Sequence, residues 1–248
     1  MAEFKIKIAG RVIRVRSLFE STRDYCRAYL TEENPELSVE VTAENLLFEQ
    51  EQYDEEAREE GFRRRRFTDP FLERTAIQRK IAEFLFDDRV LMVHGSAVAL
   101  DGAGYLFTAR SGTGKSTHTR LWREVFGSRA VMVNDDKPFV RLGAQEPLVC
   151  GSPWSGKHGL DTNITVPLKG ICILVRGSEN RIRRLEPTQA LDLLRHQSYR
   201  PLDIRKLPQF LTMTQALAER IPLWHMECTM DPQAAQLAWE AMTSQGQV

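Results

Sequence analysis

Cysteine is scarce in this chain of 248 residues, which has four, and no two of them form a Cys-x-x-Cys pair. The absence of that spacing argues against a zinc site and a disulfide framework. The sequence therefore predicts buried, reduced thiols in a cytoplasmic protein. The four positions are Cys26, Cys150, Cys172 and Cys228.

An excess of charge of one sign and long apolar runs are also missing. Lysine plus arginine and aspartate plus glutamate both number 34, so the net charge is zero and no basic field indicates nucleic acid. The apolar run at residues 171–175 is far too short to span a bilayer. Residues 1–8 alternate charged and apolar side chains, without the apolar core of a secretory signal. We expect no nucleic-acid partner, no membrane partner and a cytoplasmic location.

The most informative segment present is residues 109–117, Ala-Arg-Ser-Gly-Thr-Gly-Lys-Ser-Thr. A short apolar run typical of a strand precedes it, and a pattern typical of a helix follows it. In that context the segment indicates a phosphate-binding loop, in which backbone N–H groups and a helix N-terminus surround the phosphates of a nucleotide. A chance pattern in an ordinary turn is the alternative. Ala109 stands where the strict pattern has glycine, and alanine is tolerable there if no positive φ is needed.

Particular residues of this loop have expected roles. Lys115 would reach the β- and γ-phosphates, and the hydroxyl of Ser116 would ligate Mg²⁺. The residues expected to bind the nucleotide are Ser111, Gly112, Thr113, Gly114, Lys115, Ser116 and Thr117.

Two adjacent carboxylates follow the next predicted strand, residues 130–133. Asp135 comes 20 positions after Lys115 (135 minus 115), where a parallel sheet would bring a strand end beside the loop. Neighbouring residues at a strand end point to opposite sides. One carboxylate could therefore hold Mg²⁺ through water while the other takes a proton from an acceptor hydroxyl. A simple turn over residues 134–138 is the alternative.

Two further groups are candidates for the same edge. His94 ends another predicted strand and could hydrogen-bond Asp135, although a packed or surface histidine is the alternative. Residues 151–159 hold glycines, a proline and a tryptophan around adjacent basic side chains. Such a loop could close over phosphates, with Lys157 offering charge to the transferring group; an ordinary surface turn is the alternative.

The organisation along the chain predicts a small N-terminal α+β appendage over residues 1–62 and a nucleotide-binding domain over residues 63–248. The appendage would contain a hairpin around residues 9–10, a short helix at 21–30 and a strand at 37–41. The run of four arginines at 63–66 could dock a partner, but a solvated linker or helix face is the favoured interpretation. Beyond it, alternating strand and helix patterns predict an α/β domain.

Three segments in this order resemble the catalytic domain of the HPr serine kinase/phosphorylase family. They are residues 93–95 (Val-His-Gly), 111–116 (Ser-Gly-Thr-Gly-Lys-Ser) and 134–136 (Asn-Asp-Asp). The chain is more similar still to compact HPr-kinase-like serine kinases. Their Asn-Asp-Asp-Lys-Pro and Gly-x-Pro-Trp-x-Gly-Lys patterns stand here at residues 134–138 and 151–157. The resemblance covers roughly residues 90–240.

The resemblance implies an α/β fold with the P-loop core shared with phosphoenolpyruvate carboxykinase. It implies that Lys115 and Ser116 bind ATP and Mg²⁺, that Asp135 is the base toward a serine hydroxyl, and that Asp136 assists the metal. His94 would pair with the base. A homo-oligomer is also consistent with the family.

Two departures from the family pattern narrow this expectation. Thr117 follows the loop serine where the full enzymes usually have an acidic residue, and the Glu-x-Arg-Gly-Leu-Gly phosphorylase segment is only faintly echoed at residues 168–171. The sequence therefore predicts an ATP- and Mg²⁺-dependent kinase acting on a hydroxyl, such as a serine of a small protein or peptide, without a clear phosphorylase function. A small-molecule kinase and a non-catalytic nucleotide-binding regulator stay open as alternatives.

Overall fold

The computed structural model describes residues 1–59 and 61–244. By the density of internal contacts the chain divides into two compact units, Met1–Phe84 and Leu85–Val248. Each unit builds its own β-sheet, and α3 (Asp69–Asp87) runs across the division. The predicted domain boundary, between residues 62 and 63, stays a prediction.

The first unit is built on a β-hairpin. Strands β1 (Ala2–Ile8) and β2 (Arg11–Ser17) pair antiparallel, and the turn residues Ala9 and Gly10 have φ values of 51° and 84°. Two positive φ values in a two-residue loop match the twist of the flanking strands, so the predicted hairpin is confirmed. Strand β3 (Leu37–Glu40) then pairs parallel with β2. Between β2 and β3 lie α1 (Glu20–Tyr25) and the short helix η1 (Arg27–Tyr29).

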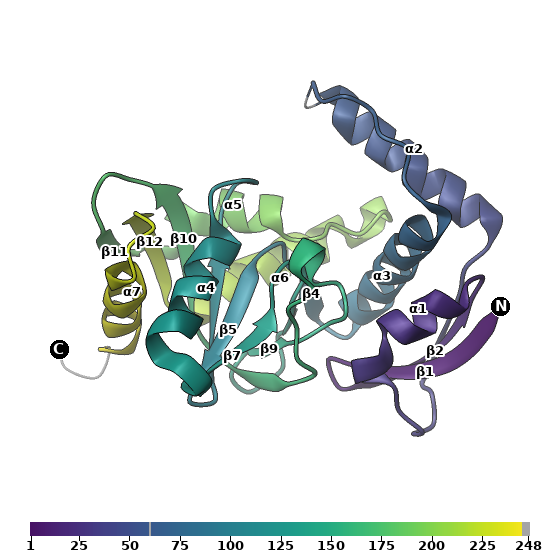
Figure 1. The fold of residues 1–248 in the computed structure, drawn as a ribbon, viewed down its shortest axis with the longest axis horizontal. Coiled ribbons are helices and arrows are strands. Elements are labelled where there is room, and N and C mark those ends of the chain that lie inside the picture. Colours follow the sequence, from purple (N-terminus) through teal and green to yellow (C-terminus); the bar gives the residue numbers. More distant parts are fainter. Residues whose placement is uncertain (60, 245–248) are drawn as a thin grey trace. The chain divides into compact units, whose positions relative to one another are not determined.

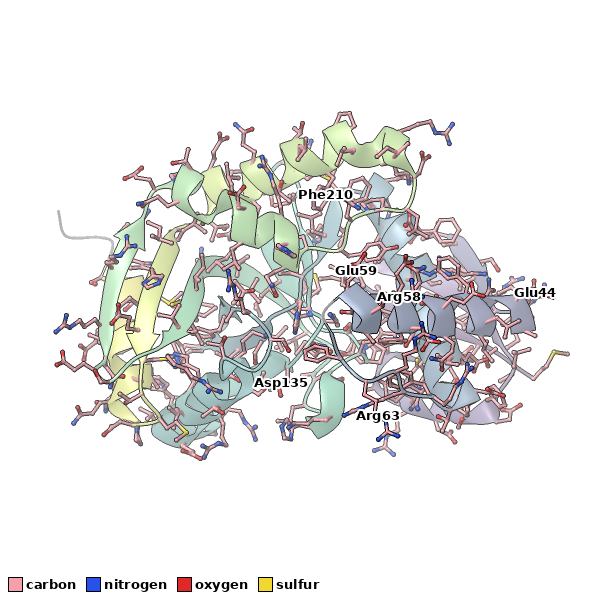
Figure 2. The ribbon with its side chains drawn as sticks, turned by 90° about the horizontal axis from the view of Figure 1, so that it is seen from above. Glu44, Arg58, Glu59, Arg63, Asp135 and Phe210 are labelled. Carbon is pink, nitrogen blue, oxygen red and sulfur yellow. The ribbon has the colours of Figure 1, made fainter. Side chains whose placement is uncertain are left out.

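The charged stretch after this sheet forms α2 (Ala43–Glu59), which carries Glu44 near one end and Arg58 near the other (Figure 2). The arginine run at residues 63–66 follows in an exposed, non-helical segment. The side chain of Gln50 holds this segment to α2, because its amide nitrogen donates to the carbonyl of Arg65 and its oxygen accepts from the N–H of Phe67. These bonds fix the backbone of the run and leave its arginine side chains exposed to solvent.

The second unit contains a sheet of nine strands around β10 (Thr165–Arg176). Its middle residues pair parallel with β6 (Ala103–Thr108) and its last residues pair parallel with β12 (Leu223–Cys228). Its first residues pair antiparallel with β9 (Leu148–Cys150). Beyond β6 the sheet continues through β5 (Ser96–Leu100) to β7 (Ala130–Asn134). The remaining strands are β4 (Val90–Met92), β8 (Phe139–Arg141) and β11 (Arg181–Leu185).

Helices cover both faces of this sheet (Figure 1). Alternate residues of the central strands enter two different apolar clusters, as expected for strands that are buried on both sides. Leu106 and Ile171 belong to a cluster with α5 (Pro187–Gln197) and α6 (Leu207–Arg220). Phe107 and Cys172 belong to a second cluster with α4 (Lys115–Phe126) and α7 (Gln233–Thr243). Short helices η2 (Gly127–Arg129), η3 (Gly156–His158) and η4 (Ile204–Lys206) complete the unit.

The predicted mixed α/β class is confirmed, and the finer assignment to a P-loop core stays a prediction. Strand β5 lies antiparallel between β6 and β7, so β6 and β7 run in the same direction and end at the same edge of the sheet. Strand β5 begins at that edge. Over the described residues, no helix is both long and apolar enough to cross a membrane.

Candidate active site

The candidate site lies where β6 and β7 end and β5 begins. The loop after β6 contains Gly112 and Gly114, with φ values of 74° and 118°, a region of backbone space that glycine enters without steric cost. Ala109 is buried and is not one of the described non-glycine residues with positive φ. The condition under which alanine is tolerable at this position is therefore met.

Lys115 is the first residue of α4 and is largely buried against the loop. Its Nζ lies 3.3 Å from the carbonyl oxygen of Ala109. Burial lowers the pKa of Lys115, and Lys137 lowers it further, while the carboxylates of Asp136 and Asp135 oppose the shift. The side chain is thus a desolvated donor within the electrostatic range of both predicted carboxylates.

The two adjacent aspartates face different partners. Oδ1 of Asp135 accepts a hydrogen bond of 2.6 Å from the hydroxyl of Ser96, the first residue of β5. Asp135 is 6% exposed and directly follows β7 (Figure 2). Asp136 is one-third exposed at its side chain, and its Oδ1 lies 3.4 Å from Nε2 of His94. The geometry therefore gives each carboxylate a separate environment.

The pairing of His94 differs from the one expected. The sequence predicts a contact with Asp135, but the structure gives His94 the neighbouring Asp136 as its carboxylate partner. The reason is the alternation of side chains at the end of β7, which turns Asp135 toward the buried Ser96. Burial, with Lys137 and Lys115 nearby, lowers the pKa of His94 to about 3. Burial also raises the pKa of Asp136.

Asn134, the last residue of β7, joins the carboxylates to the loop at residues 151–159. Its amide nitrogen donates to the carbonyls of Ser152 (2.8 Å) and Trp154 (3.3 Å). Its oxygen accepts from the N–H groups of Asp136 (2.8 Å) and Lys137 (2.6 Å). A single buried amide therefore fixes both the backbone that carries Asp136 and the loop that contains Lys157.

The same loop reaches Asp136 directly at Gly156. A Cβ placed on Gly156 would lie 3.1 Å from Cβ of Asp136, and the backbone there has a φ of 69°. Lys157 and His158 follow in the exposed helix η3. The structure thus brings the loop predicted from the sequence to the aspartate pair, with Lys157 exposed to solvent one residue beyond the contact.

A cleft of about 490 Å³ borders the glycine-containing loop. It is formed by residues 109–113, by the carboxyl end of β10 and by Leu193 of α5. Arg176, at the end of β10, donates from Nη2 to the carbonyl of Gly112 (2.6 Å), and its Nε lies 3.4 Å from the carbonyl of Thr113. The lining of the cleft therefore combines apolar side chains of β10 with the glycine-containing loop.

Several residues of this arrangement carry no signal in the sequence. Ser96 stands in an apolar strand. Thr119, whose hydroxyl lies 2.7 Å from that of Ser96, stands in the amphipathic helix α4. A local pattern therefore presents both as core positions. Arg176 follows an apolar run as an ordinary charged strand end. The metal-donor groups are sparse: over the described residues, no cluster of three or more His, Cys, Asp or Glu could hold an ion.

Comparison with known proteins finds a structural similarity but no sequence relative. No protein-family model matches the chain, and no curated protein matches it. Among solved structures, the chain is similar to the Hpr(Ser) kinase/phosphatase from Coxiella burnetii, with a TM-score of 0.37 and 11% sequence identity. The similarity covers 61% of this chain and 92% of that chain. The case for a function therefore depends on the geometry of the site.

Proposed function

We propose that this protein is an ATP- and Mg²⁺-dependent phosphotransferase that moves the γ-phosphate to a hydroxyl, such as a serine of a small protein or peptide. The observation that carries the proposal is the contact of His94 with Asp136, at the sheet edge where Lys115 begins α4. Transfer of a phosphoryl group to a hydroxyl uses a loop that holds the phosphates and a carboxylate positioned to accept the hydroxyl proton.

Phosphate binding is assigned to residues 111–117. The positive φ values of Gly112 and Gly114 allow consecutive N–H groups to converge on an anion, and α4 contributes the partial positive charge of its N-terminus. Lys115 then supplies a full charge. Because Lys115 is desolvated, its attraction to a phosphate oxygen is stronger than that of a lysine in water.

The residues present fit Mg²⁺. This ion prefers oxygen ligands and is usually held by one or two protein groups together with nucleotide phosphates. The hydroxyl of Ser116 and the carboxylate of Asp135 are such groups, and Asp135 has one oxygen committed to Ser96. When bound, Mg²⁺ would neutralise the charge that develops on the β- and γ-phosphates.

Proton transfer is assigned to Asp136, which reverses the division of roles that the family resemblance implies. Asp136 is the more exposed of the pair and contacts His94. Its raised pKa brings a carboxylate closer to the operating pH, which improves a general base. The neutral His94 can donate from Nε2 to Oδ1 and hold the carboxylate in place. The hydroxyl proton passes to Asp136 as the oxygen bonds to the γ-phosphorus, and the bond to ADP breaks.

Two remaining features support the same chemistry. The cleft beside the loop, with Ile173, Leu174 and Leu193 in its lining, offers an apolar surface of the kind that receives a nucleoside. Lys157 stands one residue after the contact of Gly156 with Asp136. We assign it to the transferring phosphoryl group, where a positive charge would stabilise the developing transition state.

The experiment is phosphoryl transfer from γ-labelled ATP with Mg²⁺ to proteins and peptides of a cell extract from the source organism. The Lys115→Ala variant is the control for a contaminating kinase. A labelled serine that depends on Lys115 supports the proposal. ADP release with a metabolite panel and no labelled protein would instead identify a small-molecule kinase. Nucleotide binding without consumption of ATP by any acceptor would contradict the proposal and favour a regulator.

A further inference from the structure

A chain of three buried polar side chains connects α4 to the end of β7. The hydroxyl of Thr119 lies 2.7 Å from the hydroxyl of Ser96, which lies 2.6 Å from Oδ1 of Asp135. Ser96 is 0% exposed, Thr119 1% and Asp135 6%. Buried hydrogen bonds of this length are costly to break, because each group would lose its partner without gaining water.

The direction of the hydrogen bonds follows from proton counting. An ionised carboxylate can only accept hydrogen bonds, so the hydroxyl of Ser96 donates its single proton to Asp135. Thr119 must therefore be the donor to Ser96. Its other neighbours, the carbonyl oxygens of Ser116 and Lys115, lie farther away at 3.3 and 3.4 Å. The chain thus runs from Thr119 through Ser96 to Asp135, and each bond polarises the next.

The three hydrogen-bonded side chains fix one oxygen of the Asp135 carboxylate. Oδ1 is held by Ser96, while Oδ2 has no hydrogen-bond partner in the part of the chain that the structure describes. Thr119 stands three residues after Ser116 and four after Lys115 on α4, so the three side chains share one face of the helix. The orientation of Asp135 is therefore tied to the helix whose first residues we assign to phosphate and metal.

We propose that Ser96 and Thr119 are positioning residues for the divalent metal of the nucleotide complex. They hold Asp135 so that Oδ2 faces the ion together with the hydroxyl of Ser116. Mg²⁺ demands near-ideal octahedral geometry, so a carboxylate that is free to rotate would serve it poorly. The inference rests on the proposed nucleotide site, but it does not depend on the identity of the acceptor.

The test measures metal-dependent nucleotide binding rather than turnover. Mn²⁺ replaces Mg²⁺ as the probe, and its binding with ATP is followed by electron paramagnetic resonance. We expect Ser96→Ala and Thr119→Val to weaken Mn²⁺ binding by about 10- to 100-fold, the usual effect of removing outer partners of metal ligands. Binding of ATP in EDTA, followed by calorimetry, should change less than about twofold, since the loop is untouched.

Two variants separate positioning from a general effect on folding. Thr119→Ser keeps the hydroxyl and should bind Mn²⁺ like the wild type. Thr214→Val removes another buried threonine hydroxyl, on α6. This hydroxyl lies outside the site and donates only to carbonyl oxygens of its own helix. This variant should also match the wild type. Should Ser96→Ala not fold, Thr119→Val carries the test, because valine keeps the shape of threonine.

The inference is overturned if Thr119→Val binds Mn²⁺ and ATP as tightly as the wild type. It is also overturned if the substitution weakens the binding of ATP in EDTA by the same factor as the binding of Mn²⁺. Failure of the proposed function would look different. If the wild-type protein binds Mn²⁺ and ATP, the Ser96 and Thr119 variants weaken that Mn²⁺ binding, and no hydroxyl is phosphorylated, the kinase assignment is contradicted and the positioning role is supported.

Discussion

Nε2 of His94 lies 3.4 Å from Oδ1 of Asp136, and the two side chains are each about one-third exposed. Desolvation keeps His94 neutral, with its pKa at about 3, so the pair is a neutral donor beside a carboxylate rather than an ion pair at neutral pH. This relationship distinguishes Asp136 from Asp135, whose partner is the buried Ser96. The aspartates can therefore be tested separately.

Asp136→Asn should lower kcat for phosphoryl transfer by about 10²- to 10⁴-fold, the usual contribution of a general base, with little change in ATP affinity. Asp135→Asn should instead weaken Mn²⁺ binding, because it removes the charge of a carboxylate that we assign to the metal. Transfer of labelled phosphate and titration with a fluorescent ATP analogue measure the two effects. Turnover retained in Asp136→Asn, with loss in Asp135→Asn at saturating metal, would return the base role to Asp135.

His118 should make the fold sensitive to acid. It is 2% exposed, and its Nε2 accepts a hydrogen bond of 3.2 Å from Nε1 of Trp122, so protonation would both bury a charge and break this bond. Desolvation lowers its pKa from 6.5 to about 4. Between these values the unfolded chain binds more protons than the folded one, so stability is complete above pH 6.5 and is lost as pH falls toward 4.

Replacing His118 with glutamine should remove that loss, since glutamine can accept from Trp122 and does not titrate. The free energy of unfolding of the wild type should drop by about 1 to 2 kcal/mol more than that of the variant between pH 7 and pH 5. Chemical denaturation at several pH values measures it. The exposed His196→Gln on α5 is the control. Parallel pH curves for wild type and His118→Gln would refute the assignment.

Gly151 is required where the loop at residues 151–159 comes close to the backbone of Thr162 and Val133. A Cβ at this position would lie 2.0 Å from the carbonyl oxygen of Thr162 and 3.0 Å from that of Val133, which are backbone atoms and cannot rotate away. Gly151→Ala should therefore destabilise the protein by about 1 to 3 kcal/mol, as overpacking does. Gly143→Ala meets nothing within 4 Å and should change stability by less than about 0.5 kcal/mol. Equal melting temperatures for the two variants would contradict this account.

Elements with a clean local pattern could be predicted from the sequence. The sequence predicts a strand at residues 223–228 and a helix at residues 208–220. Strand β12 (Leu223–Cys228) has the predicted bounds, and α6 (Leu207–Arg220) begins one residue before the predicted helix. The apolar run at residues 171–175 predicts a strand, but β10 covers Thr165–Arg176. The predicted strand starts too late because Pro167 and Gly170 interrupt the apolar pattern in the first half of β10. That half is held by pairing with β9, which is only three residues long and leaves no periodicity to read.

Candidate residues of the site could be named from the sequence only where they form a motif. The loop, the aspartates and the loop around Lys157 are recognisable from residue type and order. The position of Ser96 depends on β5 lying between β6 and β7, whereas the sequence predicts the aspartates' strand directly beside the loop. Since this order is set by long-range pairing, the local sequence could not show that a buried serine would give Asp135 a different partner from that of Asp136.

Arg176 should control the affinity of the loop for nucleotide. Its guanidinium holds the carbonyl oxygens of Gly112 and Thr113, and each peptide plane ties a carbonyl rigidly to the next N–H. Holding these oxygens therefore fixes the direction of the N–H groups that would meet phosphate. Because Arg176 is exposed, the effect is modest: Arg176→Ala should weaken ATP binding by about 3- to 10-fold, equal to one or two ordinary hydrogen bonds.

The matched control is Arg181→Ala, an exposed arginine on β11 whose partner is Glu179. It removes the same charge from a strand that pairs with β12 and not with β10, and it should leave affinity unchanged within about twofold. Arg176→Lys keeps the charge but lacks the planar fork, so it should lie between the alanine variant and the wild type. Titration with a fluorescent ATP analogue at two salt concentrations decides the mechanism. If Arg176→Lys binds like the wild type, and the loss in Arg176→Ala vanishes at high salt, Arg176 acts through charge alone and does not orient the loop.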